Sequence, residues 1–313
     1  MANKKIDVVG LGACGVDYIT KVTSFADKNS KSTSHNIALH PGGLTTNNLV
    51  QASRLGLRTA WCGILGKDEL GKFLLADLKT EKIGATYSIK DKTQFAWIVV
   101  DEKGEREIYV FPNSSMLLTP EMVEKSFKRK IQQAKHFHTE IAVIPLAAAI
   151  RGAEIARDAS ARVFLDVDGN IDTLLEEGKI GTKEEVRKLF HLADVIKLSE
   201  SAAKELAGKR GMKELVQKLL LHSTIVAITL GEKGCYIADK NNFVYCPAVK
   251  VHCLDSTGAG DAFMGGLSYA ILKGMTLPEI GRFANACGAY NCLSIGARGS
   301  GTLAPVNALL TKR

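Results

Sequence analysis

Short apolar segments that end in, or just before, a glycine or acidic residue recur along this chain of 313 residues. They are IDVVGLG (6–12), TAWCGIL (59–65), ARVFLDVD (161–168), DVIKLSE (194–200) and STIVAITLG (223–231). Short apolar runs bounded by turn residues are typical of strands that are buried on both faces. AKHFHTE (134–140) is a further predicted strand region.

Segments with helical periodicity lie between these strands. The predicted helices are TTNNLVQASRLG (45–56), ELGKFLLADLKTEKIG (69–84), TPEMVEKSFKRKIQQA (119–134), TKEEVRKLF (182–190), GAGDAFMGGLSYAILKG (258–274) and LPEIGRFANACGAYNCLSIG (277–296). Gly56 and Gly84 are expected to end the first two helices. Thr119 followed by proline predicts a helix start, and Thr182 with Glu185 predicts a capping box. Repeated strand–helix units predict an α/β fold with a mainly parallel, doubly wound sheet and helices on both faces.

The pattern changes to the two-residue period of strands between 94 and 111. QFAWIVVDEKGEREIYVF predicts two strands around a DEKG turn. This hairpin, within about 88–112, and the polar segment at about 17–40 are expected to form a small accessory sheet. The length suits one α/β domain with such an appendage, so we treat 1–313 as a single domain.

Composition narrows the class of protein. The chain is 46% apolar and 24% charged, which is ordinary for a soluble globular protein. The net charge of +8 favours anionic ligands, but the basic residues are scattered and the densest cluster, KSFKRK (125–130), lies in a helix-like stretch. This pattern argues against a nucleic-acid partner.

Neither a membrane nor an oxidising compartment is indicated. The longest apolar run, IAVIPLAAAI (141–150), is too short to span a bilayer. Seven cysteines form no CxxC pair, and MANKKIDVVG does not have the pattern of a signal peptide. We therefore expect a cytoplasmic protein with reduced thiols.

DSTGAGDAF (255–263) is the segment with the clearest chemistry. If a helix begins near Gly258, the N–H groups of residues 258–261 point out of its first turn, at the positive end of the helix dipole. Such a site favours phosphate. An acid placed there would repel phosphate unless it accepts a proton from an attacking hydroxyl, so Asp261 is a candidate general base. The alternative is a glycine-rich turn followed by a helix-capping aspartate.

Other motifs of this kind are absent or incomplete. The chain has no GxxxxGK[ST] segment. GLGACG (10–15) matches GxGxxG, but a polar stretch rather than a clear helix follows it, which disfavours a dinucleotide site. His136 and His138 alternate on one strand without a third ligand, so we interpret them as packing or surface residues.

Four segments together resemble the ribokinase, or pfkB, family of sugar kinases. DSTGAGDAF is similar to the C-terminal signature of that family, and GILGKDELG (63–71) to part of its N-terminal signature. PGGLTTNNLVQASRLG (41–56) resembles its Gly-Gly and Asn pattern, and GACGVD (12–17) the segment with a sugar-binding Asp. The resemblance implies a ribokinase-like fold whose accessory sheet is a lid over the sugar, and a homodimer formed through the lids.

The resemblance also implies residue roles. Asp261 would be the catalytic base, with an anion hole formed by Gly258, Ala259 and Gly260. The sugar would be held by Asp17, Gly43 and Asn47, because carboxylate and amide groups suit hydroxyl contacts. The residues implied for ATP are Thr229, Gly231 and Gly234 at the phosphates and Asn285 beside the adenine or ribose.

The same resemblance implies sites for two metal ions. Asp255 resembles a residue that helps to build a monovalent-cation site, for an ion such as K⁺. The family commonly holds Mg²⁺ through an Asn-x-x-Glu motif, but here Ser199 and Ala202 occupy those positions. We expect either Glu200 or Glu205, or Asp166 together with Asp168, to take over the contact through water.

The function expected from these motifs is an ATP-dependent kinase that phosphorylates a hydroxyl of a sugar such as a ketohexose or pentose. A nucleoside kinase remains open, with Phe95, Trp97 and Phe111 as a slot for the base. A phosphosugar kinase would need basic residues that the pattern does not locate. A non-catalytic sugar-binding or regulatory homologue is favoured by the altered magnesium motif and disfavoured by Asp261 and its glycines.

Overall fold

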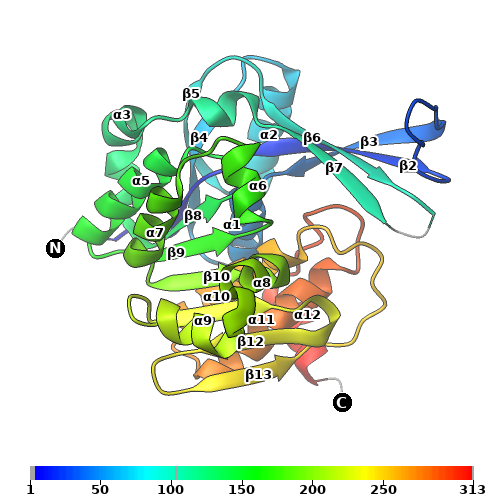
Figure 1. Ribbon diagram of the computed structural model, residues 1–313. Coiled ribbons are helices and arrows are strands. Elements are labelled where there is room, and N and C mark those ends of the chain that lie inside the picture. The colour runs from blue at the N-terminus through cyan, green and yellow to red at the C-terminus, as the bar shows by residue number, and fades with distance from the viewer. Residues whose placement is uncertain (1–3, 103–104, 312–313) are drawn as a thin grey trace.

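The computed structural model describes residues 4–102 and 105–311, which form two β-sheets (Figure 1). The strands of the larger sheet are β1 (Ile6–Leu11), β4 (Thr59–Leu65), β5 (Gly84–Ile89), β8 (Ala134–Ile141), β9 (Arg162–Val167), β10 (Val195–Leu198), β11 (Ile225–Thr229), β12 (Gly234–Ala238) and β13 (Phe243–Pro247). Their order is β13-β12-β11-β10-β9-β8-β1-β4-β5. All pairs from β11 to β5 are parallel, whereas β12 and β13 pair antiparallel at one edge.

Helices cover both faces of this sheet. One layer contains α1 (Leu44–Arg54), α2 (Glu69–Thr80), α10 (Ala259–Leu272), α11 (Leu277–Asn291) and α12 (Leu303–Thr311). The other contains α3 (Pro120–Met122), the π-helix η2 (Val123–Phe127), α4 (Lys128–Ile131), α5 (Leu146–Asp158), α6 (Ile171–Glu176), α7 (Lys183–Leu192), α8 (Glu200–Ala207) and α9 (Met212–Leu219). The 3₁₀ turns are η1 (Asn113–Leu117), η3 (Gly208–Arg210) and η4 (Gly231–Lys233). The doubly wound α/β fold is confirmed.

Alternation along the strands builds a core on each side of the sheet. On β9, the side chain of Leu165 packs with the α5 layer and that of Phe164 packs with the α10 layer, and both are fully buried. This is why the strand appears in the sequence as a continuous apolar run. The described residues contain no helix that is both long enough and apolar enough to cross a bilayer.

The smaller sheet projects from the side of the body in Figure 1. It is formed by β2 (Gly15–Val22), β3 (Ser34–Gly42), β6 (Gln94–Val100) and β7 (Arg106–Phe111), in the order β3-β2-β6-β7. The predicted hairpin is confirmed, since β6 and β7 pair antiparallel. Lys103 and Gly104 of the expected DEKG turn lie outside the described residues.

Two predicted helix boundaries were wrong, and a third predicted helix is interrupted. Helix α2 ends at Thr80 because Lys82 takes a left-handed conformation (φ 58°), and Gly84 instead opens β5. Helix α11 ends at Asn291 rather than 296, because the Cys292 carbonyl accepts the Leu254 N–H from another loop. The helix expected over 119–134 begins after a Thr119 cap as predicted, but a π-helical turn at 123–127 interrupts it.

The strand order indicates where on the sheet a ligand would bind. Strand β1 lies between β8 and β4, and the chain adds strands outward in both directions from this point. In such sheets ligands bind beyond the carboxyl ends of the strands, at the point where the order reverses. Helices α1 and α10 pack against each other in the layer that covers this region.

Candidate active site

The N-terminus of α10 forms a backbone donor site. Gly258 has φ 75°, and a Cβ built on it would lie 2.2 Å from the Ala297 carbonyl oxygen, so only glycine fits. Within the described residues, the N–H groups of Gly258, Gly260 and Asp261 have no acceptor. The Ala259 N–H differs from the expectation because it donates to the Ser256 carbonyl oxygen (3.2 Å). Three N–H groups therefore remain available to an anion at the positive end of this helix.

Asp261 is buried in the first turn of α10, at 9% exposure. Its Oδ2 accepts a hydrogen bond of 2.8 Å from Asn47 Nδ2 on α1. Burial, with a further contribution from Asp166, raises the pKa of Asp261 to about 8, although Lys197 and the Asn47 bond act in the opposite direction. Once ionised, a carboxylate with so high a pKa is a strong proton acceptor.

Arg298 fixes the orientation of the Asn47 amide. Its Nε donates to Asn47 Oδ1 (2.9 Å), which leaves Nδ2 of the same amide to donate to Asp261. One guanidinium nitrogen of Arg298 pairs with Asp77 on α2, and the other donates to the Gly42 carbonyl oxygen (3.0 Å). The Arg298 side chain is only 6% exposed. A hydrogen-bonded series thus runs from Asp77 through Arg298 and Asn47 to Asp261.

The predicted sugar residues lie close to this series. Gly43 is the N-cap of α1, the helix on which Asn47 lies in the next turn. The Asp17 carboxylate lies against Gly42, where a Cβ would meet Asp17 Oδ2 at 2.4 Å. Burial raises the pKa of Asp17 to about 6, against the attraction of Arg298. The structure therefore brings Asp17, Gly43 and Asn47 together with Asp261.

Three charged side chains lie side by side on adjacent strands beneath the two helix N-termini. Glu140 on β8 is in register with Asp166 on β9, which is in register with Lys197 on β10, and all three are at most 2% exposed. Glu140 Oε2 accepts from the Ala13 and Thr45 N–H groups, so it caps α1. Burial raises the pKa of Glu140 to about 7.

Lys197 connects this row to the donor site. Its Nζ donates to Asp166 Oδ1 (2.8 Å), and a Cβ built on Gly260 would lie 3.0 Å from the same Nζ. Burial alone would lower the pKa of Lys197, but Asp166, Asp168 and Asp261 outweigh burial and raise it. The ammonium group therefore stays charged and lies beside the backbone of the donor site.

The residues predicted for ATP lie along one edge of the sheet. Thr229 ends β11, Gly231 lies in η4, and Gly234 opens β12 with φ 111°. Asn285 on α11 is buried, and its Nδ2 donates to the Cys246 and Pro247 carbonyl oxygens (3.0 and 3.1 Å). The Asn285 amide thus holds α11 to the end of β13, and its Oδ1 has no protein donor among the described residues.

The predicted metal residues have separate environments. Asp255 accepts from the Thr257 N–H and hydroxyl and from the Gly296 N–H (2.8 Å), which hold its pKa low and tie two loops together. Arg106 at the start of β7 also donates to the Thr257 hydroxyl (2.8 Å), so the small sheet contacts this loop. Glu200 forms an ion pair with Lys204 (2.6 Å) in the first turn of α8.

The residues at and near the altered magnesium motif have different partners in the structure. Ser199 is the N-cap of α8 and accepts from the Ala202 N–H. Glu205 accepts from the Ile171 and Asp172 N–H groups (2.7 and 2.8 Å), so it caps α6. Asp166 Oδ2 is buried without a hydrogen-bond partner. Of the four acids considered for magnesium, Asp166 is the one with a buried oxygen that lacks a hydrogen-bond partner, and Asp168 two residues later is exposed.

Sequence reasoning missed Glu140, Lys197 and Arg298. A lysine inside the apolar strand VIKL and an acid following HFHT were available signals, because charged residues are rarely fully buried unless they are paired. Arg298 lies in a loop rich in glycine and gave no signal. His136 and His138 pack on Phe164 and bond Ser268, so they are packing residues. The described residues hold no group of three or more His, Cys, Asp or Glu side chains placed to bind a metal ion.

Comparison with known proteins gives consistent matches over almost the whole chain. A family model described as pfkB family carbohydrate kinase matches residues 4–303. Fructokinase-2 of Solanum habrochaites is 31% identical over 308 residues, which cover 93% of this chain and 91% of the relative. Fructokinase-1 of Zea mays is 30% identical and covers 93% of both chains.

Solved structures show the same fold. Ribokinase from Thermotoga maritima has a TM-score of 0.84 at 22% identity and covers 98% of this chain and 100% of its own. Arabidopsis thaliana ribokinase, solved with ribose and ATP, has a TM-score of 0.84 at 20% identity, covering 98% and 99%. These likenesses confirm the ribokinase-like architecture.

Proposed function

Because the chain belongs to the pfkB family of carbohydrate kinases, we propose that it transfers the γ-phosphate of ATP to a hydroxyl of a free sugar. The observation that carries the proposal is the position of Asp261. This buried carboxylate, oriented by Asn47, lies in the helix turn whose Gly258 and Gly260 N–H groups are available to an anion. A module that only bound sugar would have no use for a base at that position.

The proposed mechanism divides the work among these residues. Asp17 and Asn47 hold the sugar hydroxyls, and Asp261 removes the proton from the attacking hydroxyl. The oxygen then attacks the γ-phosphorus and ADP leaves, while the N–H groups of the α10 turn and the Lys197 ammonium stabilise the negative charge. Thr229, Gly231 and Gly234 would contact the ATP phosphates, and Asn285 the adenosine.

Two ions complete the proposal. The partnerless, buried Asp166 Oδ2 and the half-buried Glu200 fit the water-rich shell of Mg²⁺, which needs few direct carboxylates. Mg²⁺ would neutralise phosphate charge. Asp255, whose oxygens tie two loops beside the anion site, supports a K⁺ site built mainly from loop carbonyls.

Fructose is the substrate we propose first, because relatives at 30–31% identity over almost their whole length are named fructokinases. Phe95, Trp97 and Phe111 do not favour a nucleoside. Phe95 is in register with Phe111 and stacks on it, and Asp17 is in register with Ala96, so the aromatic side chains lie on the opposite face of the small sheet from Asp17.

Steady-state turnover tests the proposal. With Mg·ATP, we expect fructose to give the highest kcat/KM in a panel that also contains ribose, glucose, fructose 6-phosphate and adenosine. A preference for adenosine would favour the nucleoside alternative. Binding of sugar without turnover of any compound would favour the non-catalytic homologue.

The raised pKa of Asp261 predicts a pH dependence. A general base works only when ionised, so activity should be present above the pKa of about 8 and lost below it. We expect kcat/KM for fructose to fall roughly tenfold per pH unit below about pH 8. Asn47→Ala removes a hydrogen bond that favours the ionised form of Asp261. It should therefore raise the pKa of Asp261 and move the fall in kcat/KM to higher pH. A flat profile between about pH 6 and 9 would refute the assignment.

We also propose that the small sheet is a lid and a dimer interface. Trp97 on β6 and Tyr109 on β7 are directly opposite each other. Tyr18 on β2 is in register with both Trp97 and Leu39, so the Leu39 side chain lies on the same face of the small sheet. Trp97, Tyr109, Leu39 and Phe111 are 41–55% exposed, although large apolar side chains are usually covered. A second copy of this face would bury them.

Trp97→Glu should therefore yield a monomer, because it places a charge in the apolar interface. Size-exclusion chromatography with light scattering should show a dimer for the wild-type protein. Lys21→Glu, a charge reversal elsewhere on the same sheet, is the matched control and should remain dimeric. A monomeric wild-type protein at high concentration would exclude the interface.

A further inference from the structure

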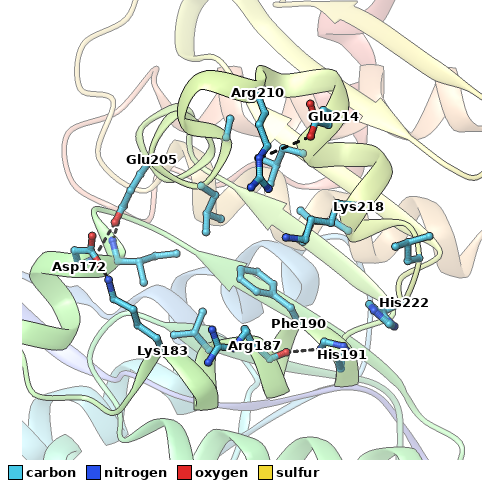
Figure 2. A pocket seen from close by; sticks show the side chains of 17 residues that line it. Asp172, Lys183, Arg187, Phe190, His191, Glu205, Arg210, Glu214, Lys218 and His222 are labelled. Atoms are coloured by element: carbon cyan, nitrogen blue, oxygen red, sulfur yellow. Dashed lines mark hydrogen bonds and ion pairs between the residues drawn. The ribbon is translucent and has the colours of Figure 1, made fainter.

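A cavity of about 520 Å³ lies in the helix layer on the opposite side of the sheet from α10. It is bounded by α6, α7, α8 and α9 and by the turn that follows α9 (Figure 2). Its volume is in the range of small-molecule sites. None of the residues proposed for sugar or ATP lines it, and of the acids considered for magnesium only Glu205 does, with its two oxygens already bonded to the N–H groups of Ile171 and Asp172.

The floor of the cavity is apolar. It is formed by buried or partly buried side chains from three helices: Val186, Phe190, Leu206, Leu215 and Leu219. Phe190 lies centrally among the labelled residues in Figure 2. Such a surface suits a ring or short hydrocarbon body, since apolar area removed from water stabilises the complex.

Cationic side chains surround this floor. Arg187 on α7 and Lys218 on α9 line the cavity from opposite helices, and neither forms an ion pair with any described residue. Arg210 has only a distant carboxylate partner, Glu214, at 3.8 Å. In Figure 2 the three side chains lie around Phe190. Three weakly neutralised cations next to an apolar floor favour a ligand with a multiply charged anion.

Of the three acids that line the cavity, only Glu214 lies beside these cations, at 3.8 Å from Arg210, and it leaves Arg187 and Lys218 without an ion pair among the described residues. Asp172 is paired with Lys183 (2.7 Å), and Glu205 accepts two backbone N–H groups at the start of α6. Figure 2 shows Asp172, Lys183 and Glu205 together at one end of the cavity, away from Lys218. The anionic subsite is therefore the part of the cavity around Phe190, with Arg210 and Lys218 on one side of the ring and Arg187 on the other.

We propose that this cavity binds an organic phosphate monoester with an apolar or aromatic body, at a site separate from the proposed catalytic centre. The phosphate pairs with Arg187, Lys218 and Arg210, because guanidinium groups match phosphate oxygens in geometry as well as in charge. The body rests on Phe190 and the leucines. The inference does not depend on the proposed kinase activity, since it concerns none of those residues.

Calorimetric titration with 1-naphthyl phosphate tests both halves of the proposed ligand. The full-length protein is first saturated with Mg²⁺ and a non-hydrolysable ATP analogue, so that the proposed nucleotide site is filled. We expect 1-naphthyl phosphate to bind at least about tenfold more tightly than inorganic phosphate or 1-naphthol, because each control lacks one of the two contacts.

Three variants locate the site. Arg187→Gln and Lys218→Gln should each weaken binding of 1-naphthyl phosphate roughly tenfold, the effect of one charge-assisted contact. Lys213→Gln is the matched control, because Lys213 is an exposed lysine of α9 that does not line the cavity. It should leave the Kd within about twofold.

Two results would overturn the proposal. One is that 1-naphthyl phosphate binds no more tightly than inorganic phosphate or 1-naphthol. The other is an equal effect of Arg187→Gln, Lys218→Gln and Lys213→Gln, which would mean general attraction to a basic protein. Sugar phosphorylation, measured separately, decides the proposed catalytic function whichever way this titration falls.

Discussion

Asp261→Asn is expected to lower kcat about a thousandfold, within the range that general bases contribute. The amide of asparagine cannot take up the hydroxyl proton, but its oxygen can still accept the hydrogen bond from Asn47 Nδ2. The fold and the binding of ATP should therefore be retained. Steady-state kinetics with fructose, together with thermal unfolding, would measure both effects.

Asp158→Asn is the matched control for this substitution. Asp158 is an exposed aspartate at the end of α5 and forms no ion pair with the described residues. The control variant should keep wild-type kcat. A loss of less than about tenfold in Asp261→Asn would show that another group accepts the proton.

Arg298→Met is expected to have the second large effect, on both stability and rate. Arg298 is buried and Asp77 is partly buried, so removing Arg298 leaves Asp77 without its partner. Breaking a fully buried pair typically costs about 3–5 kcal/mol in the free energy of unfolding, and we expect the lower end of that range here. The Asn47 amide also loses the donor that fixes its orientation. Because small displacements at a reacting centre cost about a hundredfold in rate, we expect kcat to fall by about that factor.

A double variant separates the two effects. Asp77→Leu combined with Arg298→Met removes both charges, so denaturant unfolding should show that much of the lost stability returns. The kcat value should stay low, because Asn47 still lacks its partner. Recovery of kcat in parallel with stability would contradict a positioning role and make Arg298 purely structural.

Local motifs explain what the sequence could predict. The spacing Gly258-Ala259-Gly260-Asp261 at a helix start is contained in four consecutive residues, so its geometry follows from the helix itself. Strands β1 and β4 were equally visible, because burial on both faces makes each one mainly apolar, with Asp7 as the one charged residue of the two strands. Strand β5 was missed because its residues are exposed or only partly buried and form no apolar run, and its first residue, Gly84, was assigned to the end of the preceding helix.

The electrostatics of the site could not be predicted in the same way. The hydrogen bond between Arg298 and Asn47 joins residues 251 positions apart, and that between Lys197 and Asp166 depends on the register of two strands. The Ala259 N–H was expected to be free but is used in a turn, because the chain folds back through Ser256 before the helix. Each of these features depends on the tertiary arrangement.

The most direct test of the central claim is the identity and amount of product formed from Mg·ATP and fructose. We expect mass spectrometry to detect a fructose monophosphate in one-to-one amount with ADP, and about a thousandfold less of both products in the same time with Asp261→Asn. Formation of ADP without a phosphorylated sugar, or equal product from the wild-type protein and Asp261→Asn, would contradict the proposal that Asp261 activates a sugar hydroxyl for phosphoryl transfer.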